Sequence, residues 1–177
     1  MKLILKERIL TIFDSFNIYD EAGNVRFKVH GKLAWGHKLV ICDAAGNELG
    51  TVREKIIDLM PHFDLYKGGD KVGTVSKKIT LLRPKFKVDY RDWEADGDIL
   101  QWNYVIKSGR GGEAARIYKK LIRLVDTYVI DVADDADVLD VLMTVLAIEA
   151  EKCTAQKKEE KREPKLTEAK AKASKMK

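Results

Sequence analysis

The stretch VICDAAGNELGTV (residues 40–52) repeats a pattern that the chain has already used in NIYDEAGNVRFKV (residues 17–29). Both contain I-x-D-x-A-G-N, and the two glycines, Gly23 and Gly46, lie 23 residues apart. Asp and Asn bond their own backbone and glycine adopts positive φ without steric cost, so the pattern is typical of a turn between strands. Alternating apolar residues on both sides predict β-hairpins.

A second pattern has the same period. An apolar residue, two further residues, a base and another apolar residue follow each turn, in VHGKL (29–33), VREKI (52–56), VSKKI (75–79) and IYKKL (117–121), and LKERI (5–9) fits at the start. The first four copies in chain order begin 24, 23 and 23 residues apart. Regular spacing with turn signals predicts an all-β barrel or sandwich.

Apolar runs between turn residues predict about twelve strands. We expect them near residues 2–12, 15–20, 25–33, 38–43, 48–57, 62–67, 71–81, 85–90, 92–97, 99–107, 113–121 and 127–132. Pro61 and Pro84 fall between these runs, as expected for a residue that cannot donate to a strand ladder.

The segment DDADVLDVLMTVLAIEA (residues 134–150) follows a different pattern. It lacks Gly and Pro, begins with Asp residues that can cap a helix, and has ten apolar residues among the thirteen from 138 to 150. We expect a helix about 20 Å long with a narrow polar stripe of Asp137, Asp140 and Thr144. A helix this apolar must be enclosed, so we predict that the sheet closes around it.

The net charge of +5 belongs to the end of the chain. Residues 151–177 contain ten Lys or Arg and five Glu, whereas the other 150 residues contain 23 basic and 23 acidic side chains. The end is also poor in large apolar groups. We therefore expect a barrel domain at 1–150 and a mobile basic tail at 151–177.

Other sequence features limit the location and the chemistry. No run of eighteen apolar residues predicts a transmembrane helix, and the N-terminus does not resemble a signal peptide. Cys42 and Cys153 lack CxxC spacing and suggest a reducing compartment, so we expect a cytoplasmic protein, with peripheral membrane attachment as an option. No P-loop, nucleophile elbow or dinucleotide fingerprint is present, and we expect neither catalysis nor a cofactor.

Longer stretches carry a family resemblance: GKLAWGHKLVICDAAGNELGTVREKI, PHFDLYKGGDKVGTVSKKI, RPKFKVDYRDWEADGDIL and DTYVIDVADDAD before the apolar helix. Over roughly residues 1–150 the chain resembles the LURP-one-related family, in the tubby-like superfamily that also includes the phospholipid scramblases. The resemblance implies a twelve-stranded antiparallel barrel around a central hydrophobic helix. Eukaryotic tubby domains bind phosphoinositides through basic residues and scramblases act at membranes, but their functional residues match no positions here.

The recurrent bases are the main candidates for a binding site. They are Arg8, Lys32, Lys55, Lys78 and Lys120. Each would point away from the neighbouring apolar residues of its strand, so together they could form a partial ring on the outer wall of the barrel that binds phosphate. The alternative is a solvated face on which lysines protect strand edges.

Other residues have structural alternatives that we favour. Asp131, Asp134, Asp135 and Asp137 could bind calcium, but they lack the EF-hand pattern and suit a helix N-terminus. His30, His37 and His62 lack metal-ligand spacing. Trp35, Trp93 and Trp102 suit the core or its rim better than a stacking platform.

Three function classes remain at this point. We favour a non-enzymatic binding module whose partner is an anionic phospholipid or membrane surface. The alternative is a protein that binds nucleic acid or another polyanion through its basic tail. An enzyme with a site in the barrel mouth would need convergent polar groups that the sequence does not reveal.

Overall fold

A computed structural model describes residues 1–6, 15–34, 36–55, 62–78, 80, 84–122 and 125–155. In these residues twelve strands form a closed barrel. They are β1 (Lys2–Leu5), β2 (Ser15–Tyr19), β3 (Val25–Ala34), β4 (Gly36–Asp43), β5 (Glu48–Lys55), β6 (His62–Lys67), β7 (Asp70–Lys78), β8 (Lys85–Val88), β9 (Trp93–Asp98), β10 (Asn103–Ser108), β11 (Glu113–Ile122) and β12 (Val125–Val132).

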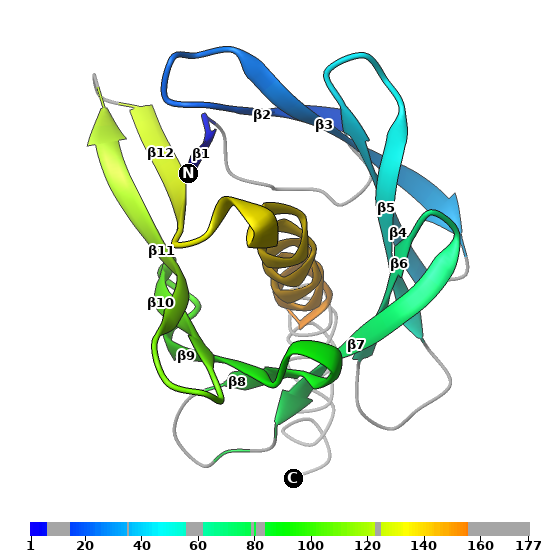
Figure 1. Ribbon diagram of the computed structural model, residues 1–177, viewed down its shortest axis with the longest axis vertical. Helices are drawn as coiled ribbons and strands as arrows, with labels where there is room; N and C mark the ends of the chain where they lie inside the picture. The colour runs from blue at the N-terminus through cyan, green and yellow to red at the C-terminus, as the bar shows by residue number, and fades with distance from the viewer. Residues whose placement is uncertain are drawn as a thin grey trace, which may run out of the picture.

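The order of the strands in the barrel follows their order in the chain. Each strand is antiparallel to its sequence neighbours, and β1 closes the ring by pairing with β12 (Figure 1). The predicted mainly-β fold and its twelve-stranded antiparallel barrel are therefore confirmed.

The repeated I-x-D-x-A-G-N patterns form the turns between β2 and β3 and between β4 and β5. The carboxylates of Asp20 and Asp43 accept hydrogen bonds from the backbone N–H groups of Asn24 and Asn47, at 2.8 and 2.9 Å. The glycines have φ of 87° and 100°, a region that favours glycine because it lacks Cβ. The repeat thus encodes one turn geometry twice.

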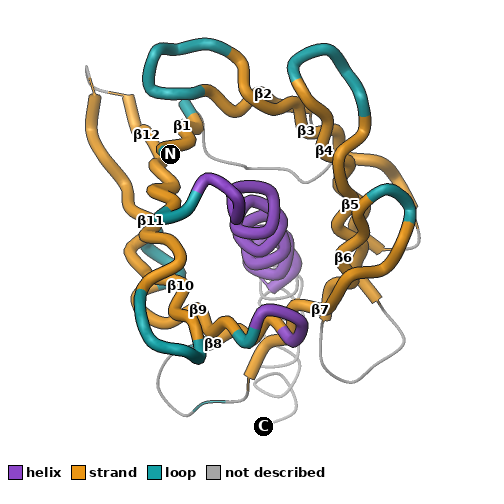
Figure 2. The backbone as a smooth tube through the Cα atoms, in the orientation of Figure 1, coloured by secondary structure: helices purple, strands orange, loops and turns teal. Residues whose placement is uncertain are grey.

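A single turn of 3₁₀ helix, η2 (Asp135–Asp137), leads into an α-helix over residues 138–155. The helix runs through the middle of the ring of strands (Figures 1 and 2). Val141 and Leu142 have no exposed surface, and every described side chain from 140 to 153 is buried. The enclosed helix is therefore confirmed, and the domain boundary predicted at residue 150 falls inside it. No helix in the described part is long and apolar enough to cross a bilayer.

The two ends of the barrel differ. Both I-x-D-x-A-G-N turns lie at one end, which we call the hairpin end, and there the N-terminal amino group of Met1 pairs with Asp135 at 2.9 Å. Since neighbouring strands are antiparallel, β3, β5, β7 and β11 all finish at the opposite end. The last described helical turns lie at that opposite end, where Lys77 near the end of β7 binds Glu151 at 2.9 Å.

Candidate functional site

The structure describes four of the five predicted bases. Lys32, Lys55, Lys78 and Lys120 are exposed on β3, β5, β7 and β11, and each lies at or near the last residue of its strand. All four therefore occupy the outer wall near the opposite end of the barrel. Arg8 lies outside the described residues.

These four lysines do not converge on one point. They stand on alternate strands or further apart, so neighbours are separated by at least about 10 Å, twice the spacing of adjacent strands. Lys55 lies 3.7 Å from Asp64, and Lys78 forms an ion pair with Glu94. A single phosphate group cannot bridge them, and their role in binding stays a prediction.

A tighter group of bases lies on β3, β4 and β5. Lys32 is directly opposite Lys38, and Lys38 is directly opposite Arg53. We call Lys32, Lys38 and Arg53 the basic row. Directly opposed residues on neighbouring strands have Cβ atoms about 5 Å apart, and like charges at this distance destabilise a sheet. The row therefore concentrates positive charge at a cost to folding.

The carboxylate that stands opposite Arg53 pairs with a base outside the basic row. Asp64 stands opposite Arg53 but pairs with Lys71 at 2.6 Å and accepts from the hydroxyl of Thr74 at 3.2 Å. Burial alone would raise the pKa of Asp64, but the hydrogen bond and charge of Lys71 outweigh burial and lower it. Among the described residues, none of the three bases of the row forms an ion pair.

A shallow groove of about 180 Å³ lies beside two members of the row, Lys38 and Arg53. Its lining is Lys38, Glu48, Thr51, Arg53, Tyr66 and Gly69. The Thr51 hydroxyl donates to Glu48 at 2.8 Å and leaves the negative charge of Glu48 in place. Among the described lining residues, two bases, Lys38 and Arg53, stand against this one carboxylate, so the groove keeps a net positive charge that can attract an external anion such as phosphate.

The acidic cluster at the start of the helix is internally satisfied. Its contacts are Asp134 with the backbone N–H of Ala136 (2.9 Å), Asp135 with the amino group of Met1 (2.9 Å), Asp137 with Arg91 (3.0 Å) and Asp131 with Lys2 (3.8 Å). These contacts favour capping and ion pairing over calcium binding. In the described part of the chain, no group of three or more His, Cys, Asp or Glu could hold a metal.

The histidines and tryptophans take structural positions where they are described. His30 bonds Ser15 at 3.0 Å, and His37 bonds Thr154 of the helix at 2.9 Å. Trp93 and Trp102 are buried in the core. Trp35 lies outside the described residues.

Sequence reasoning identified one member of the basic row and missed the other two. Lys38 and Arg53 fall outside the repeated pattern that marked Lys32. They become neighbours through strand register, which includes a bulge between Ile41 and Cys42 in the pairing of β4 with β5. The available signal was the alternation of each strand, which places all three bases on the outer face.

Comparison with known proteins gives three findings. The chain matches the LURP-one-related family over residues 1–149. It is 29% identical over 149 residues to the uncharacterized protein YxjI of Bacillus subtilis (strain 168), covering 84% of this chain and 90% of that protein. A crystal structure of a protein from Arabidopsis thaliana superposes with a TM-score of 0.55 at 20% identity, over 81% of this chain and 88% of that one, and shows the shared fold.

Proposed function

We propose that the barrel is a non-catalytic binding module for anionic phospholipid headgroups at a membrane surface. The chain belongs to the LURP-one-related family, and the proposal starts from that membership. The observation that carries this proposal is the basic row: Lys32, Lys38 and Arg53 are adjacent on the outer wall. Asp64 opposite Arg53 pairs with Lys71, and Glu48 is the one carboxylate among the described residues that line the groove, so three bases exceed the acids beside them. An external anion can balance this excess positive charge.

The expected affinity follows from the number of bases. Each base near an anionic membrane contributes about 1 kcal/mol, so the row contributes about 3 kcal/mol. That corresponds to roughly a hundredfold preference for anionic over neutral vesicles. Binding of this kind is reversible and weakens with salt, because exposed charges are screened over about 8–10 Å near physiological ionic strength.

Vesicle co-sedimentation with a matched control tests the proposal. One variant changes Lys32, Lys38 and Arg53 to Gln, and the other changes Lys78, Lys85 and Lys107 to Gln. Both remove three positive charges, but the second set is paired with Glu94 and Asp96 on another part of the wall. We expect the first variant to lose most of its binding to anionic vesicles and the second to keep most of it. If both variants lost the same amount of vesicle binding, the loss would follow from net charge alone. That result would contradict a binding site at the row.

A third protein tests the tail. A chain cut after Ala155 keeps the whole described helix and removes residues 156–177, which contain nine of the ten basic side chains of the predicted tail. We expect it to bind anionic vesicles as the full chain does. Loss of vesicle binding on truncation would show that the tail is needed for binding and would support the polyanion alternative. A binding assay with single-stranded nucleic acid would then test that alternative.

A further inference from the structure

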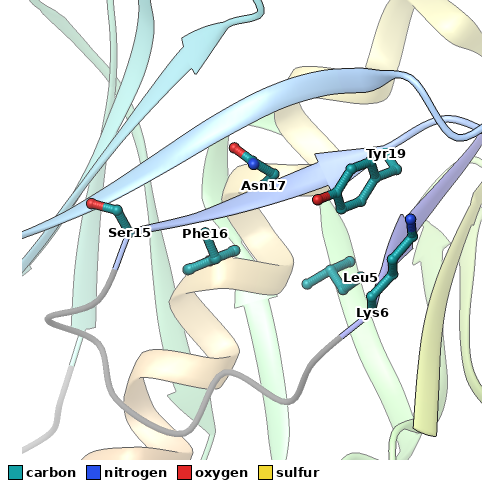
Figure 3. Close-up of a pocket in the computed structure, with 6 residues that line it drawn as sticks. All are labelled: Leu5, Lys6, Ser15, Phe16, Asn17 and Tyr19. Atoms are coloured by element: carbon teal, nitrogen blue, oxygen red, sulfur yellow. The ribbon is translucent and has the colours of Figure 1, made fainter. Parts of the chain in front are cut away.

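Among the described residues, β1 and β2 share the fewest register pairs of any two neighbouring strands in the barrel. Strand β1 pairs with β12 at four positions, and its one described pair with β2 joins Ile4 to Tyr19. Figure 3 shows the two strands diverging from Tyr19 toward Ser15. We call this gap in the wall the β1–β2 seam.

A pocket of about 280 Å³ occupies the seam. Its lining is Leu5, Lys6, Ser15, Phe16, Asn17 and Tyr19 (Figure 3). Leu5 is buried and Phe16 packs against the core, so these two side chains form an apolar floor. The other four stand at the outer rim, because successive side chains of a strand point to opposite faces. The pocket therefore has an apolar bottom and a polar mouth.

The mouth is positively charged. Lys6 is exposed, and its ammonium lies 4.1 Å from the ring centroid of Tyr19. Among the described residues it has no carboxylate partner. The amide of Asn17 and the phenol of Tyr19 add hydrogen-bond donors at the same rim. The charge and the donors together suit a small anion.

We propose that the β1–β2 seam binds a small amphipathic carboxylate, with its carboxylate on the Lys6 ammonium and its apolar body on Leu5 and Phe16. Lys6 is the one cation among the described lining residues, and it matches the single charge of a carboxylate. A ligand that covers the apolar floor removes its surface from water, and this stabilises the complex in proportion to the apolar area buried. This site is separate from the basic row and does not depend on it.

Octanoate, octanol and octylammonium, each added to the full chain below its micelle concentration, provide the test. All three have the same apolar chain and differ in the charge of the head group. In ¹⁵N-labelled protein, octanoate should shift the backbone amide signals of Leu5, Lys6 and Asn17. Octanol should shift the same signals with about tenfold lower affinity, and octylammonium should not shift them. Equal responses to the three compounds, responses centred elsewhere, or no response to octanoate would overturn the proposal.

Variants of Lys6 locate the charge effect. Lys6→Gln should weaken octanoate binding about tenfold, and Lys6→Glu should bind octylammonium in preference to octanoate. Lys2→Gln is the matched control, because Lys2 begins β1, four residues before Lys6, but already lies 3.6 Å from Glu21 and 3.8 Å from Asp131. The variant of Lys32, Lys38 and Arg53 should bind octanoate like wild type. If Lys6→Gln bound octanoate as tightly as Lys2→Gln, the seam would not be the site.

Discussion

Charges inside the barrel and charges on its outer wall are arranged in opposite ways. Each of the three buried carboxylates of the helix has a basic partner. The pairs are Asp140 with Lys67 and Arg91, Glu149 with Lys152 (2.7 Å), and Glu151 with Lys77 (2.9 Å). The basic row of Lys32, Lys38 and Arg53 has no such partner among the described residues.

The difference follows from the cost of an unpaired charge in each place. Removing one partner of a buried ion pair costs about 3–5 kcal/mol, because the remaining charge has lost its water. Like charges opposed on a solvated sheet cost only about 0.2–1 kcal/mol. A protein can retain the second arrangement but not the first. Unpaired charge on the wall is thus compatible with a binding role, whereas the pairs of Asp140 and Glu151 link the helix to the surrounding residues of the barrel.

The largest predicted effect comes from adding an unpaired charge to the interior. Leu142 has no exposed surface and lies two residues from Asp140 on the same helix. Leu142→Asp should cost more than about 4 kcal/mol, because no base is placed to receive the new carboxylate. Urea unfolding measures the loss. Leu100→Asp is the control: Leu100 is 57% exposed, and its variant should stay within about 0.5 kcal/mol of wild type. Similar stability of the two variants would mean that the helix is not enclosed.

Removing a paired interior charge should have a smaller effect. Asp140→Asn removes the buried negative charge that Lys67 and Arg91 pair with, but both bases remain about one-third exposed and can reach water. We therefore expect a loss of about 2–4 kcal/mol, below the upper range for a fully buried pair. Denaturant unfolding measures it against Asp70→Asn, a substitution of an exposed carboxylate. Equal stability of these two variants would show that the pairs around Asp140 contribute nothing.

The same pairs should make stability depend on acid pH. Burial alone would raise the pKa of Asp140, but the hydrogen bonds and charges of its neighbours, Lys67 foremost, lower it below 3.8. Asp140 therefore binds a proton more readily in the unfolded chain than in the folded one. The stabilisation from its ion pairs is present above about pH 4 and disappears as the pH falls through the pKa of Asp140 in the folded protein. The free energies of unfolding of wild type and Asp140→Asn should therefore differ at pH 7 and converge toward pH 2. A constant difference over this range would contradict the assignment.

The sequence predicted the interior better than the wall. Turn residues and the apolar helix are local signals, so the hairpins, the barrel and the enclosed helix could be predicted from spacing. Asp140 was visible as part of a polar stripe, but its partner Arg91 is 49 residues away and is brought near by the fold. The basic row depends on strand register across three strands, and the repeat identified only Lys32. Strand alternation placed Lys38 and Arg53 on the outer face, but only the register makes them neighbours of Lys32.

The smallest predicted effect on stability falls at the centre of the basic row. Lys38→Glu replaces repulsion from Lys32 and Arg53 with two opposed pairs of opposite charge. We expect the variant to be about 0.5–1 kcal/mol more stable than wild type. It should also bind anionic vesicles much more weakly, because the row has lost its central base and its remaining charges are neutralised.

Lys28→Glu controls for the change in net charge. Lys28 lies on the same strand as Lys32, but its opposed neighbours are Asn17 and Cys42, so an acid there gains no basic partner. Its stability should match wild type within about 0.5 kcal/mol, and it should retain more vesicle binding than Lys38→Glu. Thermal unfolding and co-sedimentation on the same samples measure both quantities. If Lys38→Glu were no more stable than Lys28→Glu, the three bases of the row would not repel one another. An external anion would then have no excess charge to balance at the row.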